Sequence, residues 1–198
     1  MLPFSEACER NKEPILAVLR EYFADRAHVL EIGSGTGQHA VYFARHLRHL
    51  TWHPTEQLSY LPDLTARVQL EGGENLRQPT VLDVRQSIWP LRSVDAIFTA
   101  NTLHIMSWPE VIAMHERIGS VLAPGGVMCL YGPFRYEGRY TSESNREFDQ
   151  ALKERDPASG LRDVASVTAL AAPYGLQLVA DHDLPAFNRL LVFIKEPA

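Results

Sequence analysis

Residues 28–37 place one acid and three glycines at the spacing of a nucleotide-binding turn. The segment reads HVLEIGSGTG, in which a short apolar run contains Glu31 and is followed by glycines at alternate positions. Glycine has no Cβ, so the backbone of such a turn approaches a ligand closely, and the helix expected at residues 38–47 begins with unpaired N–H groups. The segment therefore predicts a strand, a tight turn and a helix that together hold a nucleotide-like cofactor.

The spacing within the turn distinguishes between two cofactors. A dinucleotide fingerprint reads Gly-x-Gly-x-x-Gly or Ala, and the sixth position here is Gln38, which weakens the interpretation as an NAD-linked oxidoreductase. The pattern Glu-x-Gly-x-Gly-x-Gly instead resembles motif I of the class I S-adenosylmethionine (AdoMet) methyltransferases. By that resemblance the turn passes under the methionine and ribose of AdoMet, and Glu31 orients the methionine ammonium. The cofactor residues expected here are Glu31, Gly33, Ser34, Gly35, Thr36, Gly37 and His39.

Further candidate cofactor residues follow the next predicted strands, where ligands of an open α/β sheet bind. Glu56 is expected to accept hydrogen bonds from the ribose hydroxyls, and the alternative is a solvated loop glutamate. Asp83 and Val84 resemble the family position that binds adenine, although an aspartate there also suits a turn cap. Asn101 and Thr102 resemble motif IV of small-molecule methyltransferases and are expected to face the methionine end or the reacting methyl.

Strands and helices alternate along the whole chain. After a first strand that ends at the glycine turn, strands are expected at 50–53, 80–84, 94–100, 127–131, 176–184 and 189–195, with helices beginning at Pro14 and spanning 38–47, 60–71 and 110–122. This alternation indicates a parallel sheet covered by helices on both faces. The last two strands are joined by so short a link that they must be antiparallel. A seven-stranded, mostly parallel sheet with one antiparallel strand is the Rossmann-like fold of class I methyltransferases.

The length predicts a single methyltransferase domain over residues 1–198. Residues 1–27 are interpreted as an N-terminal helix that acts as a lid. Residues 132–163 are long for a strand-to-helix connection, and long inserts at a ligand face are usually lids or binding loops, so this segment is expected to cover the substrate. Within it, Ser144 and Glu147 form a capping-box pattern, which predicts a helix running to about Arg155.

Two residues near the ends of the fourth and fifth predicted strands are candidates for catalysis. His104 is the first candidate for a general base, and the alternative is a hydrogen-bonded histidine that supports its loop. Tyr131 is the second candidate. Residues that could contact the acceptor are Arg10, Asn11 and Lys12, expected just before the first helix, and Arg135 and Arg162, which could pair with a carboxylate or phosphate. Each of these is also compatible with a solvated or structural role.

Composition disfavours several classes of partner. The net charge is −5 and the cations are scattered, so nucleic acid is not an expected substrate. There is no apolar stretch of the ~20 residues needed to span a membrane and no secretory leader pattern, so a soluble, cytoplasmic protein is expected. The two cysteines and the spacing of His46, His49 and His53 do not suggest a metal site. The expected acceptor is a small molecule, methylated at O, N or S by in-line transfer without metal, and the oligomeric state stays open.

Taken end to end, the chain resembles the poorly characterised methyltransferase family that includes methyltransferase-like protein 26. The shared segments are residues 7–15, 35–39, 52–56, 100–105, 131–134 and 160–163. Two departures are Glu56, where the family commonly has Asp, and Phe187, where it has the first Asn of a Pro-Ala-Asn-Asn stretch. The resemblance implies AdoMet binding and methyl transfer, with S-adenosylhomocysteine as product, but it brings no substrate. A non-catalytic protein that binds AdoMet or S-adenosylhomocysteine is the alternative.

Overall fold

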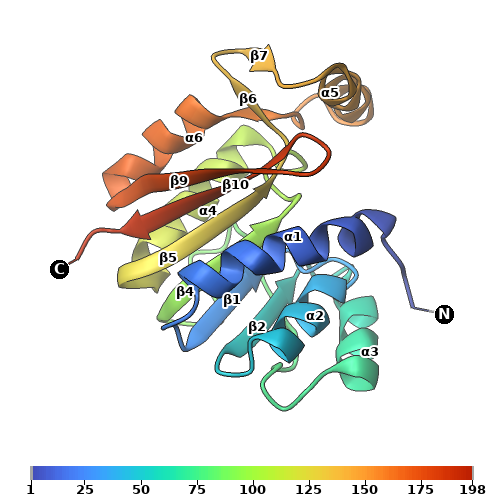
Figure 1. The fold of residues 1–198 in the computed structure, drawn as a ribbon, viewed down its shortest axis with the longest axis vertical. Coiled ribbons are helices and arrows are strands. Elements are labelled where there is room, and N and C mark those ends of the chain that lie inside the picture. Colours follow the sequence, from blue (N-terminus) through green and yellow to red (C-terminus); the bar gives the residue numbers. More distant parts are fainter. Residues whose placement is uncertain (1, 198) are drawn as a thin grey trace.

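A seven-stranded sheet forms the centre of the computed structural model, which describes residues 2–197 (Figure 1). Its strand order is β3-β2-β1-β4-β5-β10-β9, and β10 runs antiparallel to both of its neighbours while the pairs from β3 to β5 are parallel. The strands are β1 (His28–Ile32), β2 (Thr51–Glu56), β3 (Thr80–Val81), β4 (Val94–Ala100), β5 (Leu122–Gly132), β9 (Leu176–Leu184) and β10 (Asn188–Lys195). The predicted class of fold, with one reversed strand, is confirmed.

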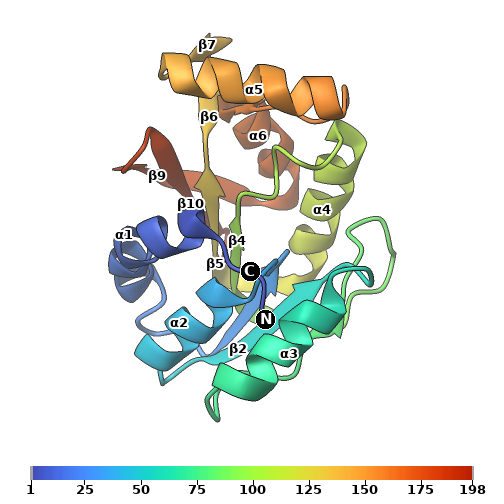
Figure 2. The same cartoon turned by 90° about the vertical axis from the view of Figure 1, so that its right-hand side faces the viewer.

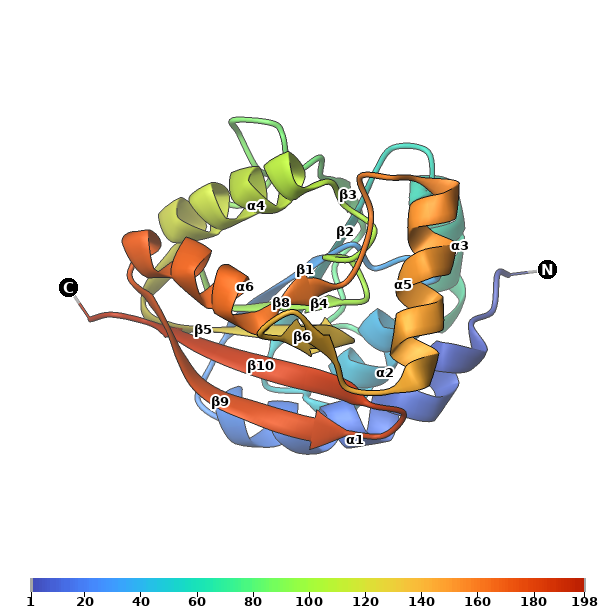
Figure 3. The ribbon, with the colours of Figure 1, turned by 90° about the horizontal axis from the view of Figure 1, so that it is seen from above.

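Helices cover both faces of the sheet (Figure 3). One face is covered by α1 (Glu6–Tyr22), α2 (Gln38–His46) and α3 (Leu61–Glu71), and the other by α4 (Trp108–Val121) and α6 (Val164–Ala171), which is followed by a short 3-10 turn, η1 (Ala172–Tyr174). The first face buries a cluster of aromatic rings, Phe43, Trp52 and Phe98, packed with centroids 5.3 to 6.0 Å apart. None of the described helices has the length and apolar character needed to cross a membrane.

The insert after β5 forms a small subdomain at the carboxyl ends of the strands (Figure 2). It contains β6 (Phe134–Tyr136), β7 (Arg139–Tyr140), α5 (Glu143–Arg155) and β8 (Arg162–Asp163), and its three strands form a second sheet. The helix ends at Arg155 as predicted, but the expected capping box of Ser144 and Glu147 is wrong. Ser142 is the N-cap, and its side chain accepts from the backbone N–H of Asn145. Ser142 has the extended backbone of an N-cap, whereas Ser144 already lies in the helix, so the capping-box match in the sequence comes two residues too late.

The first helix also begins earlier than predicted. It starts at Glu6 rather than at Pro14, because Ser5 caps it and two acids stabilise its first turn. Pro14 lies inside the helix, where it removes one backbone hydrogen bond. Residues 10–12 are therefore helical and point to different sides, instead of forming an extended segment before the helix.

Three strands differ clearly in length from the prediction, and one of them is β5, which runs from Leu122 to Gly132 instead of over 127–131. β2 runs to Glu56 and includes Pro54, whereas β3 contains only Thr80 and Val81 of the expected 80–84. The backbone of Trp52 bonds residues 75 and 77, and the carbonyl of Glu56 bonds Leu82, so both residues face the edge of the sheet on the β3 side. Every second residue of a strand faces the same neighbour, so the nitrogen of Pro54 also faces this edge. A proline is tolerated there because the edge strand is too short to require its missing N–H.

Candidate active site

Two clefts open side by side at the carboxyl ends of the strands. The first, which we call the β1 cleft, has a volume of about 390 Å³ and lies over the ends of β1, β2 and β4. The second, the α5 cleft, has a volume of about 530 Å³ and lies between α1, the end of β5, α5 and the β9–β10 turn. Asn101 and Ile105 line both clefts. A group bound in one cleft would therefore meet a group bound in the other beside Asn101.

The glycines of the turn after β1 serve two different purposes. Gly33 (φ +71°) packs so closely on Thr102 that an added Cβ would lie 2.5 Å from its methyl carbon. Gly35 (φ +54°) faces open space, since a Cβ added there would have nothing within 4 Å, and both glycines line the β1 cleft. The backbone N–H of Gly35 donates to Glu56 Oε2 at 2.8 Å. The turn thus presents bare backbone to the cleft and holds a carboxylate at its rim.

Glu31 lies in the interior rather than in either cleft. It is 2% exposed and accepts a hydrogen bond from Trp52 Nε1 at 2.8 Å. Burial raises the pKa of its carboxyl group to about 7, although hydrogen bonds from Trp52 and Ser34 oppose that rise and the charge of Glu56 adds to it. At neutral pH the group is poised between its protonated and charged forms, so a nearby cation would favour the carboxylate.

Of the two residues expected at the adenine, Val84 lines the β1 cleft and Asp83 does not. The guanidinium of Arg85 donates to both carboxylate oxygens of Asp83, at 2.6 Å to Oδ2, and the backbone N–H of Arg85 donates to Oδ1 at 3.0 Å. These bonds hold the pKa of Asp83 below its usual range. Leu82 also lines the β1 cleft. Asp83 therefore has the turn-capping geometry that the sequence left as its alternative.

Asn101 stands at the junction of the two clefts with a left-handed backbone. Its φ is +58°, a conformation that asparagine tolerates better than most residues, and its N–H donates to Tyr131 O at 2.9 Å. A Cβ added to Gly132 would lie 3.6 Å from Asn101 Oδ1 and 3.7 Å from His104 Nδ1. Both side chains therefore face the backbone at the end of β5, where no side chain intervenes.

The loop that carries His104 is held by a segment far away in the sequence. Four successive carbonyls of residues 103–106 each accept a hydrogen bond from residues 159–162. Arg162 donates to Leu103 O at 3.1 Å and also to Met106 O, Gly160 N–H donates to His104 O at 2.9 Å, and Ser159 Oγ donates to Ile105 O at 2.8 Å. Arg162 thus acts on the loop backbone, and the insert fixes the position of His104.

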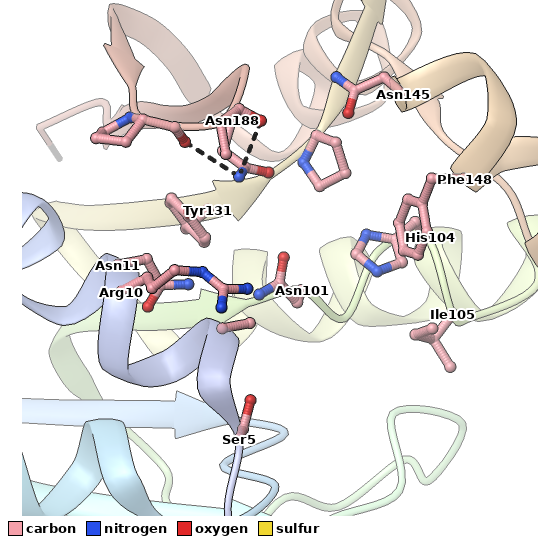
Figure 4. A pocket seen from close by; sticks show the side chains of 14 residues that line it. Ser5, Arg10, Asn11, Asn101, His104, Ile105, Tyr131, Asn145, Phe148 and Asn188 are labelled. Atoms are coloured by element: carbon pink, nitrogen blue, oxygen red, sulfur yellow. Dashed lines mark hydrogen bonds between the residues drawn. The ribbon is translucent and has the colours of Figure 1, made fainter. Parts of the chain in front are cut away.

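The imidazole of His104 is buried but has no hydrogen-bond partner among residues 2–197. It is 5% exposed, lines the α5 cleft and packs edge-on against Phe148 with ring centroids 5.2 Å apart (Figure 4). Burial, together with the charges of Arg162 and Arg155, lowers its pKa to about 4. The ring is neutral at physiological pH, with one nitrogen able to accept a proton.

Tyr131 and Asn11 form the opposite side of the α5 cleft. Asn11 Oδ1 accepts from His39 Nε2 at 2.7 Å, because an amide oxygen is only an acceptor and the ring must supply the proton. Burial lowers the pKa of His39 to about 4, so this ring is neutral. Burial raises the pKa of the Tyr131 phenol on the same side of the cleft, and the Asn11 side chain opposes that rise. His39 itself lines neither cleft and instead positions Asn11.

Of the cations predicted to bind the acceptor, most do not line the α5 cleft. Arg10 lines the α5 cleft, whereas Lys12 pairs with Glu9 and lies over the ring of Tyr42, because successive helical residues point in different directions. Arg135 lies 5.8 Å from the ring centroid of Tyr140, and Arg162 is engaged with the loop. The structure therefore brings neither Arg135 nor Arg162 to the cleft wall.

The expected site residues thus fall into two groups. Those that line a cleft are Gly33, Gly35, Glu56, Val84, Asn101, Thr102, Arg10, Asn11, His104 and Tyr131. Those that line neither are Glu31, Ser34, Thr36, Gly37, His39, Asp83, Lys12, Arg135 and Arg162. Lining residues that the sequence did not single out include Tyr60, Met106, Asn145, Phe148, Ala186 and Asn188. Asn145 and Phe148 are three apart on α5, so helical spacing within the predicted lid was the available signal.

Several solved structures share this fold across nearly the whole chain. An O-methyltransferase family protein from Burkholderia thailandensis matches with a TM-score of 0.83 and 15% identity, covering 98% of this chain and 58% of that one. Human N-acetylserotonin methyltransferase in complex with SAM matches with a TM-score of 0.81 and 16% identity, covering 96% and 53%. PigF with SAH matches with a TM-score of 0.79 and 18% identity, covering 92% and 55%.

These similarities establish the architecture. The chain spans a little over half the length of those structures, and at such identities the likeness concerns the fold alone. A family model described as a protein of unknown function (DUF938) matches residues 2–195. The chain therefore belongs to this family.

Proposed function

We propose that this protein is an AdoMet-dependent methyltransferase that acts on a small-molecule acceptor, at O, N or S, by in-line transfer without metal. The observation that carries the proposal is the meeting of two clefts at Asn101. One is lined by the glycine turn and has a carboxylate at its rim, and the other contains a buried, unpartnered histidine. Proteins with the same fold include an O-methyltransferase family protein and structures with SAM and SAH, which supports the assignment.

The residues of the β1 cleft fit AdoMet in kind and order. AdoMet would supply a methyl group on a sulfonium. An acceptor can attack this methyl carbon without help from a Lewis acid, because the neutral thioether S-adenosylhomocysteine is a good leaving group. Glu56 is assigned to the ribose hydroxyls, because Gly35 and Gln57 N–H groups already hold its carboxylate at the rim. The bare backbone at Gly35 gives the ligand close access. Val84 is assigned to the adenine end.

The remaining cofactor residues are assigned by their charge or by their position in the clefts. Glu31 is assigned to the methionine ammonium, whose positive charge would stabilise the carboxylate of a group that is half protonated at neutral pH. Because it lines neither cleft, we expect the contact to run through water or through the turn. Asn101 and Thr102 are assigned to the methionine end, where the two clefts meet. Asp83 contributes only if its pair with Arg85 opens.

The α5 cleft is assigned to the acceptor. His104 is neutral at physiological pH, so it can accept a proton from an acceptor hydroxyl, thiol or amine as the methyl group is transferred. Tyr131 is the second candidate, since its phenol lines the same cleft. The main requirement is that the acceptor atom lies ~3 Å from the methyl carbon and in line with the breaking bond. Asn101 and Ile105, which line both clefts, stand where the two bound molecules would meet.

The proposal is tested first by binding and then by transfer. Isothermal titration with AdoMet, S-adenosylhomocysteine and NAD should give heat with the first two, and Glu56→Gln should weaken both because it replaces the carboxylate at the ribose. Incubation with methyl-labelled AdoMet and a metabolite extract should then transfer label to a small molecule. Binding without transfer would favour a non-catalytic AdoMet-binding protein. Binding of NAD alone would point to an oxidoreductase and end the proposal.

A further inference from the structure

The walls of the α5 cleft carry almost no charge. Among its lining residues in the described part of the chain there is no aspartate, glutamate or lysine, and Arg10 is the one cation at neutral pH. The side chain of Arg10 is 72% exposed and lies 3.8 Å from the carboxylate of Glu6, so its charge is largely solvated and has a carboxylate partner. Most of the other polar groups are carboxamides, those of Asn11, Asn101, Asn145 and Asn188.

Asn145 presents an oxygen to the cleft in a fixed orientation. The side chain is 6% exposed, and its Nδ2 donates to Thr141 Oγ1 at 2.8 Å and to Phe187 O at 3.1 Å. Because both N–H groups are used, the amide cannot rotate without losing two hydrogen bonds. Its Oδ1 accepts no bond from the described residues and points into the cleft (Figure 4). This is an acceptor on a buried side chain, without a donor among the described residues.

Asn188 presents a second oxygen on the same wall. Its Nδ2 donates within the β9–β10 turn, to Pro185 O at 3.3 Å and to Ala186 O at 3.4 Å, as the dashed lines of Figure 4 show. The Oδ1 atom is therefore the group that remains for a ligand. The same turn is fastened to α5 by the bond from Asn145 to Phe187 O. The two oxygens are thus held together by one short network.

The opposite wall, on α1, has the reverse polarity. Asn11 Oδ1 is occupied by the proton of His39, so the Nδ2 donor is the group of Asn11 that remains for a ligand in the cleft. A bound molecule would therefore meet donors on the α1 side and acceptors on the α5 side. Between them lie the neutral ring of His104 and the apolar surface of Phe148.

We propose, building on the proposed methyl transfer, that the acceptor is an uncharged molecule that donates hydrogen bonds from hydroxyl or N–H groups to Asn145 Oδ1 and Asn188 Oδ1. A carboxylate or phosphate on this wall would face two amide oxygens with no cation to pair with it. An ammonium group would be removed from water without a carboxylate partner. Asn145 and Asn188 are in this view the residues that determine specificity for a neutral acceptor.

The charge of the acceptor can be tested before its identity is known. A metabolite extract is separated at pH 7 on anion and cation exchangers, and the unretained, anionic and cationic fractions are each incubated with the protein and methyl-labelled AdoMet. Label should enter a compound of the unretained fraction. Label mainly in either retained fraction would overturn this inference and leave the methyltransferase intact. Absence of label in all three, with AdoMet binding verified by calorimetry, would remove both.

The two asparagines are then tested with the labelled compound itself. Asn188→Ala should raise the KM for that acceptor about tenfold, because a lost hydrogen bond is worth about 1–1.5 kcal/mol, while the Kd for AdoMet stays unchanged. Gln177→Ala is the matched control, since it removes a carboxamide from the far end of the same hairpin, and it should leave KM unchanged. Asn145→Ala should act in the same direction, with thermal unfolding used to verify its fold. An unchanged KM in folded Asn188→Ala and Asn145→Ala would refute the role of this wall.

Discussion

The β1 cleft and the α5 cleft lie side by side but are built in different ways. The β1 cleft is lined largely by backbone and side chains within a few residues of a strand end, so it follows directly from the order of strands in the sheet. The α5 cleft is assembled from α1, the loop after β4, the insert and the β9–β10 turn, which meet only in the tertiary structure. The comparison indicates that topology provides the proposed cofactor site, while long connections shape the proposed acceptor site.

The largest expected effect separates the functions of the two clefts. His104→Ala removes the neutral base from the α5 cleft without touching the glycine turn or Glu56. Turnover should fall at least ~100-fold while the Kd for AdoMet stays nearly unchanged, the pattern of a group used only in the chemical step. Rates with saturating labelled acceptor and calorimetry with AdoMet measure the two quantities.

His46→Ala is the control for this experiment, because His46 is an exposed histidine on α2 whose ring bonds only its own helix. It should change neither the rate nor the affinity. A His104→Ala protein with the wild-type rate would take His104 out of the mechanism and leave Tyr131 as the candidate.

The fold could be predicted from the sequence because its signals are local and repeated. Alternating apolar strands and amphipathic helices determined the layers, and the short link at residues 185–188 determined the reversed strand. The errors occurred where two local signals competed. Pro14 marked a helix start, but the Ser5 cap and the first-turn acids outweighed it, and this moved Arg10, Asn11 and Lys12 into the helix.

The site could be predicted only in part, for a related reason. Gly33, Gly35, Glu56 and Asn101 could be predicted to line the cleft because each lies at the end of a strand or within three residues after it. The α5 wall was missed because the direction in which α5 presents its residues depends on how the insert packs, which no local pattern encodes. Arg162 was assigned to the substrate because its charge is visible in the sequence, whereas the four carbonyls it helps to hold are not.

A second, smaller effect should sharpen the role of the insert. Arg162→Lys keeps the positive charge near His104 but loses the planar fork that bonds Leu103 O and Met106 O, so the loop should loosen. We expect turnover to fall about tenfold to thirtyfold. Arg155→Gln is the matched control, because Arg155 contributes charge near His104 and none of the bonds that hold the loop. If Arg155→Gln impaired turnover as much as Arg162→Lys did, charge rather than position would be the contribution of Arg162.

A third effect tests the β1 side through pH. The pKa of Glu31 is raised to about 7 in the folded protein. In the proposed function, the charged form of Glu31 attracts the AdoMet ammonium and the protonated form does not. Affinity for AdoMet should therefore be level above pH 7, fall below it, and level off about tenfold weaker once the carboxyl group is protonated. Glu31→Gln should bind about tenfold more weakly at pH 7.5, with no such pH dependence. Calorimetry between pH 5.5 and 7.5 measures both, and an unchanged slope in Glu31→Gln would assign the dependence to another group.

Glu31→Gln should weaken AdoMet binding but raise the free energy of unfolding above neutral pH. The unfolded carboxyl titrates near 4.5 and the folded one near 7, so the folded state holds more protons between these values and the free energy of unfolding falls as pH rises through them. Glu31→Gln keeps an oxygen for Trp52 Nε1 and removes this penalty. It should be more stable than the wild type at pH 8 by about 3 kcal/mol, since the pKa rises from 4.5 to about 7 and one pKa unit corresponds to about 1.4 kcal/mol, and should lose that advantage near pH 4.5. Equal stability at pH 8 would contradict the raised pKa.

The smallest effect concerns the strained wall of the α5 cleft. Ala186 and Phe187 both have left-handed backbones, with φ of +61° and +57°, although neither is a glycine or asparagine. Phe187 is 55% exposed, so Phe187→Asn removes little packing and places a residue that tolerates this conformation. The variant should be about 1 kcal/mol more stable, a rise in Tm of about 2–4 °C for a chain of this length. Phe4→Asn, at an exposed phenylalanine without a left-handed backbone, should bring no gain. A loss of stability in Phe187→Asn would show that the ring, rather than the backbone, holds the turn against α5.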